Sequence, residues 1–271
     1  MASHDKLPFS RSSGIGLMKL QSHDTMRCVG ITKAFDGTRA LDDFSYEFPQ
    51  SGIVALIGPN GAGKTTLLNV LTGFLHPDAG RCWLGDTQLT GLSPHLICRR
   101  GIARTFQDLR LVRQETVENN VLLGRPLQRG ASLLGAIAGL GVVADQRRQR
   151  RRVEELLDQV GLAGVASQAA GELSYGQQKL LTLACCLATE PRIILLDEPV
   201  AGVDPATIPR ILDILRNLRD AGLLVVFVEH DMSAVRRVAD LVVVMDDGHL
   251  IAQGSAYGVL ERPEIIEAYV G

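Results

Sequence analysis

The chain has 271 residues, of which 46% are hydrophobic, 21% are charged and 4% are aromatic. This composition is ordinary for a globular protein and excludes an intrinsically disordered one. The formal net charge of −2 excludes a global attraction to nucleic acid, though not a local basic patch, and the scarcity of aromatic residues argues against a stacking surface for single strands. No nucleic acid is expected as a partner. No apolar run approaches the roughly 20 residues of a membrane-spanning helix. We therefore expect a soluble protein, or a peripheral one that reaches a membrane through another subunit.

The apolar pattern along the chain predicts an α/β protein. Residues 1–25 are polar and are expected to form a flexible tail before a single domain over residues 26–271. Continuous apolar runs are typical of parallel strands buried on both faces. The turn Asp246-Asp247-Gly248 predicts a hairpin near the end of the chain, followed by a short helix that ends near Tyr269. Strand-like runs occupy residues 26–35, 44–48, 53–57, 193–196, 223–228 and 241–245, and helical patterns occupy residues 64–72 and 208–219.

The middle of the chain has a different pattern, which predicts a helical subdomain over about residues 99–165. It contains no strand-like run, and Val153, Leu156, Leu157 and Val160 recur at helical spacing before Gly161, a typical helix stop. Two segments of this region have alternative interpretations. The five arginines in residues 147–152 favour a solvated helix face over a contact with anionic lipid. The apolar residues 131–144 fit a packed helical hairpin or a shallow membrane contact.

A phosphate-binding loop follows the apolar run 53–57. The segment fits the pattern G-x-x-x-x-G-K-[ST], with a strand before it and a helix after it. Backbone N–H groups of such a loop converge on phosphate oxygens, the lysine reaches the β- and γ-phosphates, and the hydroxyl after it binds Mg²⁺. The alternative is a glycine-rich turn that matches by chance. The predicted nucleotide-binding residues are Gly58, Pro59, Asn60, Gly61, Ala62, Gly63, Lys64, Thr65 and Thr66, with Thr65 as a metal ligand.

Two carboxylates end the buried run 193–196. Ligands bind at the carboxyl ends of parallel strands in open α/β sheets. Asp197 suits the Mg²⁺ coordination shell, and Glu198 suits a base that polarises a water for attack on the γ-phosphate. Two solvated acids at a strand end are the plain alternative, which the phosphate loop makes less favourable.

Two interpretations apply to the segment Leu173-Ser174-Tyr175-Gly176-Gln177-Gln178-Lys179. Locally, Ser174 and Gln177 form an S-x-x-Q capping box that predicts the start of a helix over residues 174–189. The segment also resembles the signature motif of ATP-binding cassette (ABC) ATPases, and it lies between the phosphate loop and IILLDEP in the order that this family has. The resemblance covers about residue 26 to the C-terminus. It implies a P-loop NTPase fold of the ABC type, with a mixed sheet and an inserted helical subdomain.

The resemblance assigns roles to four more residues. Gln107 in RTFQ matches the glutamine that contacts Mg²⁺ and the attacking water, and His230 in FVEHD matches the switch histidine that contacts the γ-phosphate. Asp204 in AGVDP matches the D-loop aspartate, and Phe35 in KAFDG matches the aromatic residue that stacks on adenine. Each has a plain alternative, such as a solvated loop residue or a core side chain.

The resemblance also implies how the protein works. ABC ATPases bind ATP and Mg²⁺ between two subunits packed head to tail, so that Ser174, Gly176 and Gln177 would act on the nucleotide of a second ATPase subunit. ATP would then hold a dimer closed and hydrolysis would release it. A single chain is expected to hold two half-sites, and its partner is expected to be a homologous subunit rather than an identical one.

Several stretches resemble one branch of the family, the ATPase subunits of branched-chain amino acid importers. They are GIARTFQDLRLVRQETVENNVLLG, LSYGQQKLL, EPVAGVDP and the ending EAYVG. This resemblance implies an importer motor with transmembrane permease subunits as partners, located at the cytoplasmic face of the cell membrane. Importers of urea, amides or other small solutes, a non-transport ABC ATPase, a phosphate-loop kinase or GTPase, and a cassette with little turnover are the alternatives.

Overall fold

The computed structural model of the chain describes residues 25–125, 140–263 and 265. These residues form two compact units, one with the described part of Asp108–Glu190 and the other with the described parts of Leu17–Gln107 and Pro191–Gly271. Four predictions lie wholly or largely outside the described residues. They concern the flexible tail over residues 1–25, the segment 131–144, the helix near Tyr269 and the ending EAYVG.

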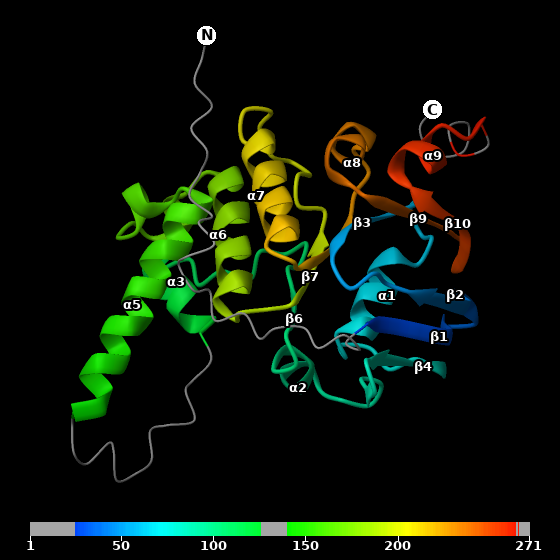
Figure 1. The fold of residues 1–271 in the computed structure, drawn as a ribbon, viewed down its shortest axis with the longest axis horizontal. Coiled ribbons are helices and arrows are strands. Elements are labelled where there is room, and N and C mark those ends of the chain that lie inside the picture. Colours follow the sequence, from blue (N-terminus) through cyan, green and yellow to red (C-terminus); the bar gives the residue numbers. More distant parts are fainter. Residues whose placement is uncertain (1–24, 126–139, 264, 266–271) are drawn as a thin grey trace. The chain divides into compact units, whose positions relative to one another are not determined.

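A six-stranded sheet contains the four predicted strands that are continuously apolar (Figure 1). Five neighbouring strands pair in parallel, and β10 pairs antiparallel with β9. All residues of β7 and β8 are buried, as expected for central parallel strands. The sheet is therefore mixed, which confirms the predicted fold class. Its order is β10-β9-β3-β8-β7-β6, with β3 at Gly52–Ile57, β6 at Ile102–Arg104, β7 at Ile193–Asp197, β8 at Leu224–Val228, β9 at Leu241–Asp246 and β10 at His249–Ser255.

The predicted hairpin joins β9 to β10. Asp247 and Gly248 both have left-handed backbone conformations, with φ of 45° and 80°, which suits a two-residue hairpin turn. The Gly248 N–H donates to the Ala62 carbonyl at 3.3 Å, and its carbonyl accepts from the Asp42 N–H at 3.1 Å. The hairpin turn therefore supports the loop that follows β3.

An antiparallel sheet of four strands belongs to the same unit. Its order is β2-β1-β4-β5, with β1 at Met26–Phe35, β2 at Thr38–Glu47, β4 at Ala79–Leu84 and β5 at Thr87–Gln88. The prediction for β1 is confirmed, whereas β2 begins earlier than the expected residue 44. Buried side chains from this sheet, from the six-stranded sheet and from α1 (Lys64–Leu71) form one hydrophobic cluster that includes Phe44, Leu67, Leu71 and Val226.

Four more helices belong to the described part of this unit. They are α2 (Pro94–Cys98), α7 (Ile208–Asp220), α8 (Met232–Val238) and α9 (Ala256–Leu260). Helix α7 buries Ile211, Leu212, Leu215 and Leu218, which repeat at the spacing of one helix face. The predicted helix over residues 208–219 is thus confirmed, and its apolar face explains why it forms.

The other unit is helical among the described residues. It contains α3 (Val117–Leu123), α5 (Leu140–Val160) and α6 (Tyr175–Ala188), with short 3₁₀ turns at Ala163–Val165 and Ala170–Glu172. Helix α5 packs against α3 and α6 and ends where predicted, before Gly161, whose φ is 67°.

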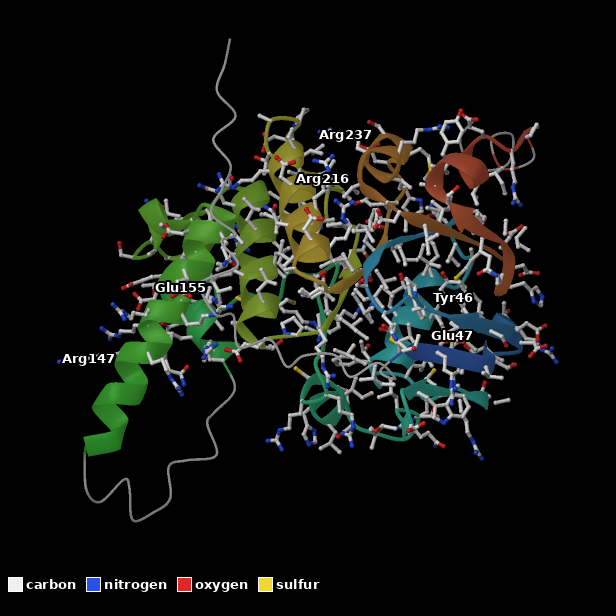
Figure 2. All side chains as sticks on the ribbon, in the orientation of Figure 1. Tyr46, Glu47, Arg147, Glu155, Arg216 and Arg237 are labelled. Atoms are coloured by element: carbon white, nitrogen blue, oxygen red, sulfur yellow. The ribbon has the colours of Figure 1, made fainter. Side chains whose placement is uncertain are left out.

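The arginine-rich part of α5 lies on the surface. Arg147, Arg150 and Arg151 are exposed, and Arg147 projects outward from the helix (Figure 2). Glu155 accepts a hydrogen bond from Arg152 at 2.9 Å, one residue away from the Arg151 partner that the sequence suggested. These exposed side chains fit the solvated helix face.

The prediction that residues 99–165 lack a strand is wrong at its start. The segment Ile102–Arg104 forms β6, which pairs in parallel with β7, and the compact helical unit begins at Asp108. A strand of three residues is too short to give an apolar run, and its place depends on a pairing with residues about 90 positions away.

A helix that spans a membrane must be both long and apolar. Among the described residues, no helix is both long and apolar enough to cross a membrane.

Candidate nucleotide-binding site

The loop between β3 and α1 curls tightly because its glycines approach other backbone segments. Gly58 and Gly63 have φ of 147° and 92°, in the region that favours glycine. A Cβ at Gly58 would collide with the Met245 carbonyl, and one at Gly63 would collide with the Ala40 carbonyl. The spacing of glycines in the motif is therefore a packing requirement of this fold.

Helix α1 begins in this loop without a side-chain cap. Its N-cap is Gly63, and no side chain accepts a hydrogen bond from the first-turn N–H groups. Four N–H groups at a helix start lack partners within the helix, and the helix dipole adds a partial positive charge. The loop and the helix start together form a site suited to phosphate.

Lys64 bends back over the loop. Its Nζ donates to the Gly58 and Pro59 carbonyls, both at 2.7 Å, and the residue is 6% exposed. Burial lowers the pKa of Lys64, and the negative charges of Glu198 and Asp197 act in the opposite direction. Both acceptors are neutral carbonyls, so a phosphate oxygen would form a stronger, charge-assisted hydrogen bond with the same nitrogen.

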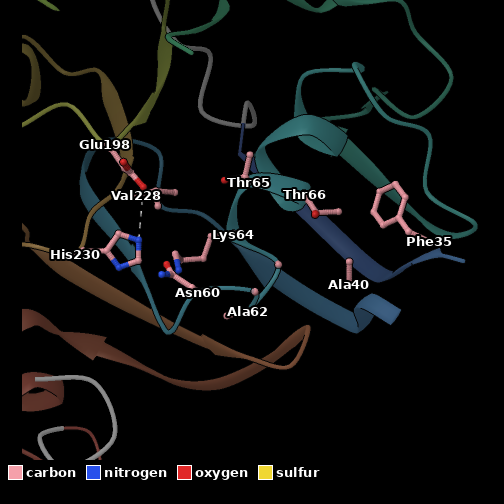
Figure 3. A pocket seen from close by; sticks show the side chains of 12 residues that line it. Phe35, Ala40, Asn60, Ala62, Lys64, Thr65, Thr66, Glu198, Val228 and His230 are labelled. Atoms are coloured by element: carbon pink, nitrogen blue, oxygen red, sulfur yellow. Dashed lines mark ion pairs between the residues drawn. The ribbon is translucent and has the colours of Figure 1, made fainter. Parts of the chain in front are cut away.

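A pocket of about 300 Å³ lies over the loop (Figure 3). This volume is at the lower end of the range for small-molecule sites. Most of the predicted residues meet here, and Ala40 and Val228, which belong to none of the predicted site motifs, complete the wall. The lining residues are Phe35, Ala40, Asn60, Gly61, Ala62, Gly63, Lys64, Thr65, Thr66, Glu198, Val228 and His230.

Glu198 and His230 face one another across one edge of this pocket (Figure 3). The Glu198 Oε1 and His230 Nε2 atoms are 3.6 Å apart, and Gln107 Nε2 donates to Glu198 Oε2 at 3.5 Å. Glu198 has a left-handed backbone with φ of 50°, which costs a non-glycine residue about 1–2 kcal/mol. Strain of this kind persists only where the surroundings fix the conformation, and it is common in catalytic loops.

Asp197 is buried at the end of β7 beside Arg104, an arginine that was not predicted as a site residue. Arg104 Nη2 lies 2.9 Å from Asp197 Oδ2, and both side chains are at most 4% exposed. Arg104 also donates to Asn69 Oδ1 on α1 at 2.7 Å and lies over the Phe106 ring at 5.0 Å. The hydroxyl-bearing Thr65 lines the pocket, and the carboxylate of Asp197 lies near enough to Lys64 to act on its charge. Both supply the hard oxygen donors that Mg²⁺ prefers, so they fit this ion.

Asp204 bonds to neighbouring residues of its own loop rather than facing the pocket. Its Oδ1 accepts from the N–H groups of Ala206 and Thr207, each at 3.1 Å, and its Oδ2 accepts from the Thr207 hydroxyl at 2.7 Å. It therefore shapes the turn before α7 and does not line the described pocket.

The predicted capping box is confirmed in the helical unit. Ser174 Oγ accepts from the Gln177 N–H at 3.3 Å, and Gln177 Oε1 accepts from the Ser174 N–H at 2.9 Å. Helix α6 spans Tyr175–Ala188, one residue shorter at each end than the expected 174–189. Gly176 is buried and Ser174 is exposed at this helix start.

A parallel strand, a glycine-rich loop, a lysine and a helix start in this order define a P-loop nucleotide-binding protein. The sequence pattern of the family described as "ABC transporter" matches residues 41–201. The chain therefore belongs to the ABC transporter family, and it is an ATP-binding cassette ATPase of that family. The family resemblance expected from the motifs is confirmed.

Individual relatives agree with this assignment. The high-affinity branched-chain amino acid transport ATP-binding protein BraF of Pseudomonas aeruginosa is 36% identical over 255 residues, which are 92% of this chain and 99% of BraF. The corresponding protein LivG of Escherichia coli is 36% identical over 89% of this chain and 96% of LivG. A solved ABC transporter cassette, MJ1267 in its ADP conformation, is 33% identical with a TM-score of 0.79 over 92% of this chain and 99% of that one.

Proposed function

We propose that the chain is the ATP-hydrolysing motor subunit of an importer for branched-chain amino acids or a related small solute. The observation that carries this proposal is the similarity to BraF and LivG, which extends over nearly the full length of this chain and of each relative. The pocket supports it, because the phosphate loop, Glu198 and His230 line one cavity.

The loop residues and α1 would hold the phosphates of ATP. Lys64 would exchange its two carbonyl acceptors for phosphate oxygens, and the Phe35 ring, which is 47% exposed at the pocket rim, would stack on adenine. Thr65, Asp197 and Gln107 would hold Mg²⁺, which when bound neutralises charge on the phosphate oxygens. Glu198 would accept a proton from the attacking water, and His230 would contact the γ-phosphate.

The partners follow from the same proposal. Ser174, Gly176 and Gln177 would contact the ATP of a second, homologous ATPase subunit in a head-to-tail dimer, and Asp204 would lie at the same interface. Transmembrane permease subunits would hold this dimer at the cytoplasmic face of the cell membrane. The relatives' names support a transport role, since both describe ATP-binding proteins of transporters.

The first test uses Glu198→Gln. An amide cannot accept the proton of the attacking water, so turnover should fall by about 10³-fold while ATP still binds. ATP hydrolysis and ATP binding are measured on the purified variant, together with its mass in solution with and without Mg-ATP. Full turnover in this variant would remove Glu198 as the base. A dimer that forms only with ATP supports pairing of two copies, and a monomer that binds ATP supports a homologous partner.

The cargo is tested in cells that lack this chain. Uptake of radiolabelled leucine should be lost and should return with the wild-type chain, but not with Glu198→Gln. Unchanged leucine uptake together with lost urea or amide uptake would replace the proposed cargo by that solute. Unchanged uptake of all of these solutes would favour an ABC ATPase without a transport role.

A further inference from the structure

Glu229 is a buried acid that the proposed mechanism does not use. It follows β8 directly and is 2% exposed. Its Oε1 accepts from the Val200 N–H at 2.8 Å, and its Oε2 accepts from the N–H groups of His230 at 3.1 Å and Asp231 at 3.5 Å. One side chain thus connects the segment after β7 with the segment after β8.

These contacts bracket Glu198 on both sides. The Glu198 N–H donates to the Val228 carbonyl at 3.0 Å, and two residues later the Val200 N–H donates to Glu229. Val228 and Glu229 are neighbours, so a single short segment holds the backbone on either side of Glu198. Glu198, in its left-handed conformation with φ of 50°, thus lies in the stretch of backbone that these two hydrogen bonds hold. Without the second contact, the Val200 N–H would lose its acceptor and the strained residue could relax.

We propose that Glu229 is a positioning residue that sets the distance between Glu198 and His230. It fixes the Glu198 loop through Val200 and fixes His230 through the His230 N–H itself. This inference rests on the roles proposed above for Glu198 and His230, because Glu229 would act only through them.

The contacts require a carboxylate rather than another polar group of the same size. A carboxylate has two acceptor oxygens, whereas a glutamine amide has one oxygen and an NH₂ group that only donates. Burial raises the pKa of Glu229, and the N–H donors of Val200, His230 and Asp231 act in the opposite direction. In Glu229→Gln, the NH₂ group would face an N–H donor on one side of the bracket, whichever way the amide turns.

The experiment compares Glu229→Gln with Asp240→Asn. Asp240 serves as a control because its Oδ2 also accepts from a backbone N–H, that of Ile53, at 2.8 Å, but at the end of β3 opposite to the phosphate loop. Unlike Glu229 it is exposed, and its Oδ1 lies 3.2 Å from Arg219 Nη1. For Glu229→Gln we expect kcat to fall at least about tenfold with an unchanged Kd for ATP, because small misplacements of reacting groups have large kinetic effects. For Asp240→Asn we expect wild-type kcat. Glu229→Asp keeps both acceptor oxygens and should recover part of the lost kcat.

A double variant separates positioning from general damage. If Glu229 sets the distance between Glu198 and His230, Glu198→Gln combined with Glu229→Gln should lose less kcat than the product of the two single losses. A multiplicative loss in the double variant would overturn the proposal. So would a kcat within twofold of wild type in Glu229→Gln, or a parallel loss of ATP affinity, thermal midpoint and kcat. If Glu198 is not the base, a different result is expected, namely full turnover in Glu198→Gln with Glu229 intact.

Discussion

The phosphate loop and the signature segment at the start of α6 are built differently in this chain. The phosphate loop lies in a unit where residues far apart in sequence converge: Lys64, Glu198 and His230 line one pocket, and Glu198 is held in a strained conformation. Ser174 in the helical unit is an exposed helix cap whose hydrogen bonds reach at most four residues along the chain. Local structure therefore explains Ser174 without any reference to nucleotide. Its proposed role depends on a second molecule, and that difference can be tested.

The largest effect on ATP affinity is expected at Lys64. Lys64→Ala removes a buried cation whose two present acceptors are neutral carbonyls of its own loop. Tight ATP binding should be lost, with an affinity decrease of about 10²-fold or more, because a charge-assisted contact to phosphate disappears from a buried site. Fluorescent ATP-analogue titration measures this decrease. Unchanged affinity would refute the assignment of the loop.

A smaller and different effect is expected at the signature helix. Ser174→Arg should leave ATP affinity at the wild-type level, because the pocket residues belong to the other unit, and should prevent ATP-dependent pairing of subunits. Turnover by the assembled ATPase should then fall by about tenfold or more. Normal turnover in this variant would contradict a role in trans.

A second helix cap controls for the loss of stability. Thr116 Oγ1 accepts from the Asn119 N–H at 3.1 Å, which is the same capping contact at the start of α3. Ser174→Ala and Thr116→Ala should each lower stability by about 1 kcal/mol. Only Ser174→Ala should lower turnover. Equal turnover losses in both variants would mean that Ser174 acts only as a helix cap and has no separate role in turnover.

The parts predictable from sequence are those whose determinants lie close together in the chain. The strand over residues 53–57, the glycine spacing and the helix start all fall within one short segment, and the capping box needs only Ser174 and Gln177. The pocket shows that this local pattern forms a site with Glu198 and His230.

The parts not predicted depend on long-range contacts. Strand β6 exists because it pairs with β7, and Arg104 is buried because it meets Asp197 across that pairing. Glu229 gave one signal that could have been used, namely an acid placed directly after the apolar run 223–228 and before His230. Its burial against Val200 still could not be read from the sequence, since Val200 lies 29 residues earlier.

The smallest effect is expected at Asp78, which supports the strand end that carries Phe35. Asp78 Oδ1 accepts from Lys33 Nζ at 2.6 Å, and Oδ2 accepts from the Ala34 N–H at 2.8 Å, next to Phe35. Lys33 Nζ also lies 5.7 Å from the centre of the Phe35 ring. Asp78→Asn should raise the Kd for ATP by about threefold or less, because exposed ion pairs contribute little. Binding of inorganic triphosphate should not change, since it lacks the base that Phe35 would contact. An equal loss for both ligands would show that the variant damages the phosphate loop instead.

The pH dependence of the same variant gives a second readout. The hydrogen bond from Lys33, followed by that from the Ala34 N–H, holds the pKa of Asp78 below its usual value of 3.8. A carboxyl whose pKa is lower in the folded state stabilises the fold above its unfolded pKa, and this contribution is lost as the pH falls through the folded value. The difference in thermal midpoint between wild type and Asp78→Asn should therefore be largest near neutral pH and should shrink below about pH 4. A difference that grows on acidification would mean that the carboxylate does not stabilise this strand end. The proposed contact of Phe35 with adenine would then not depend on Asp78, whereas the proposed phosphate contacts would keep the buried Lys64.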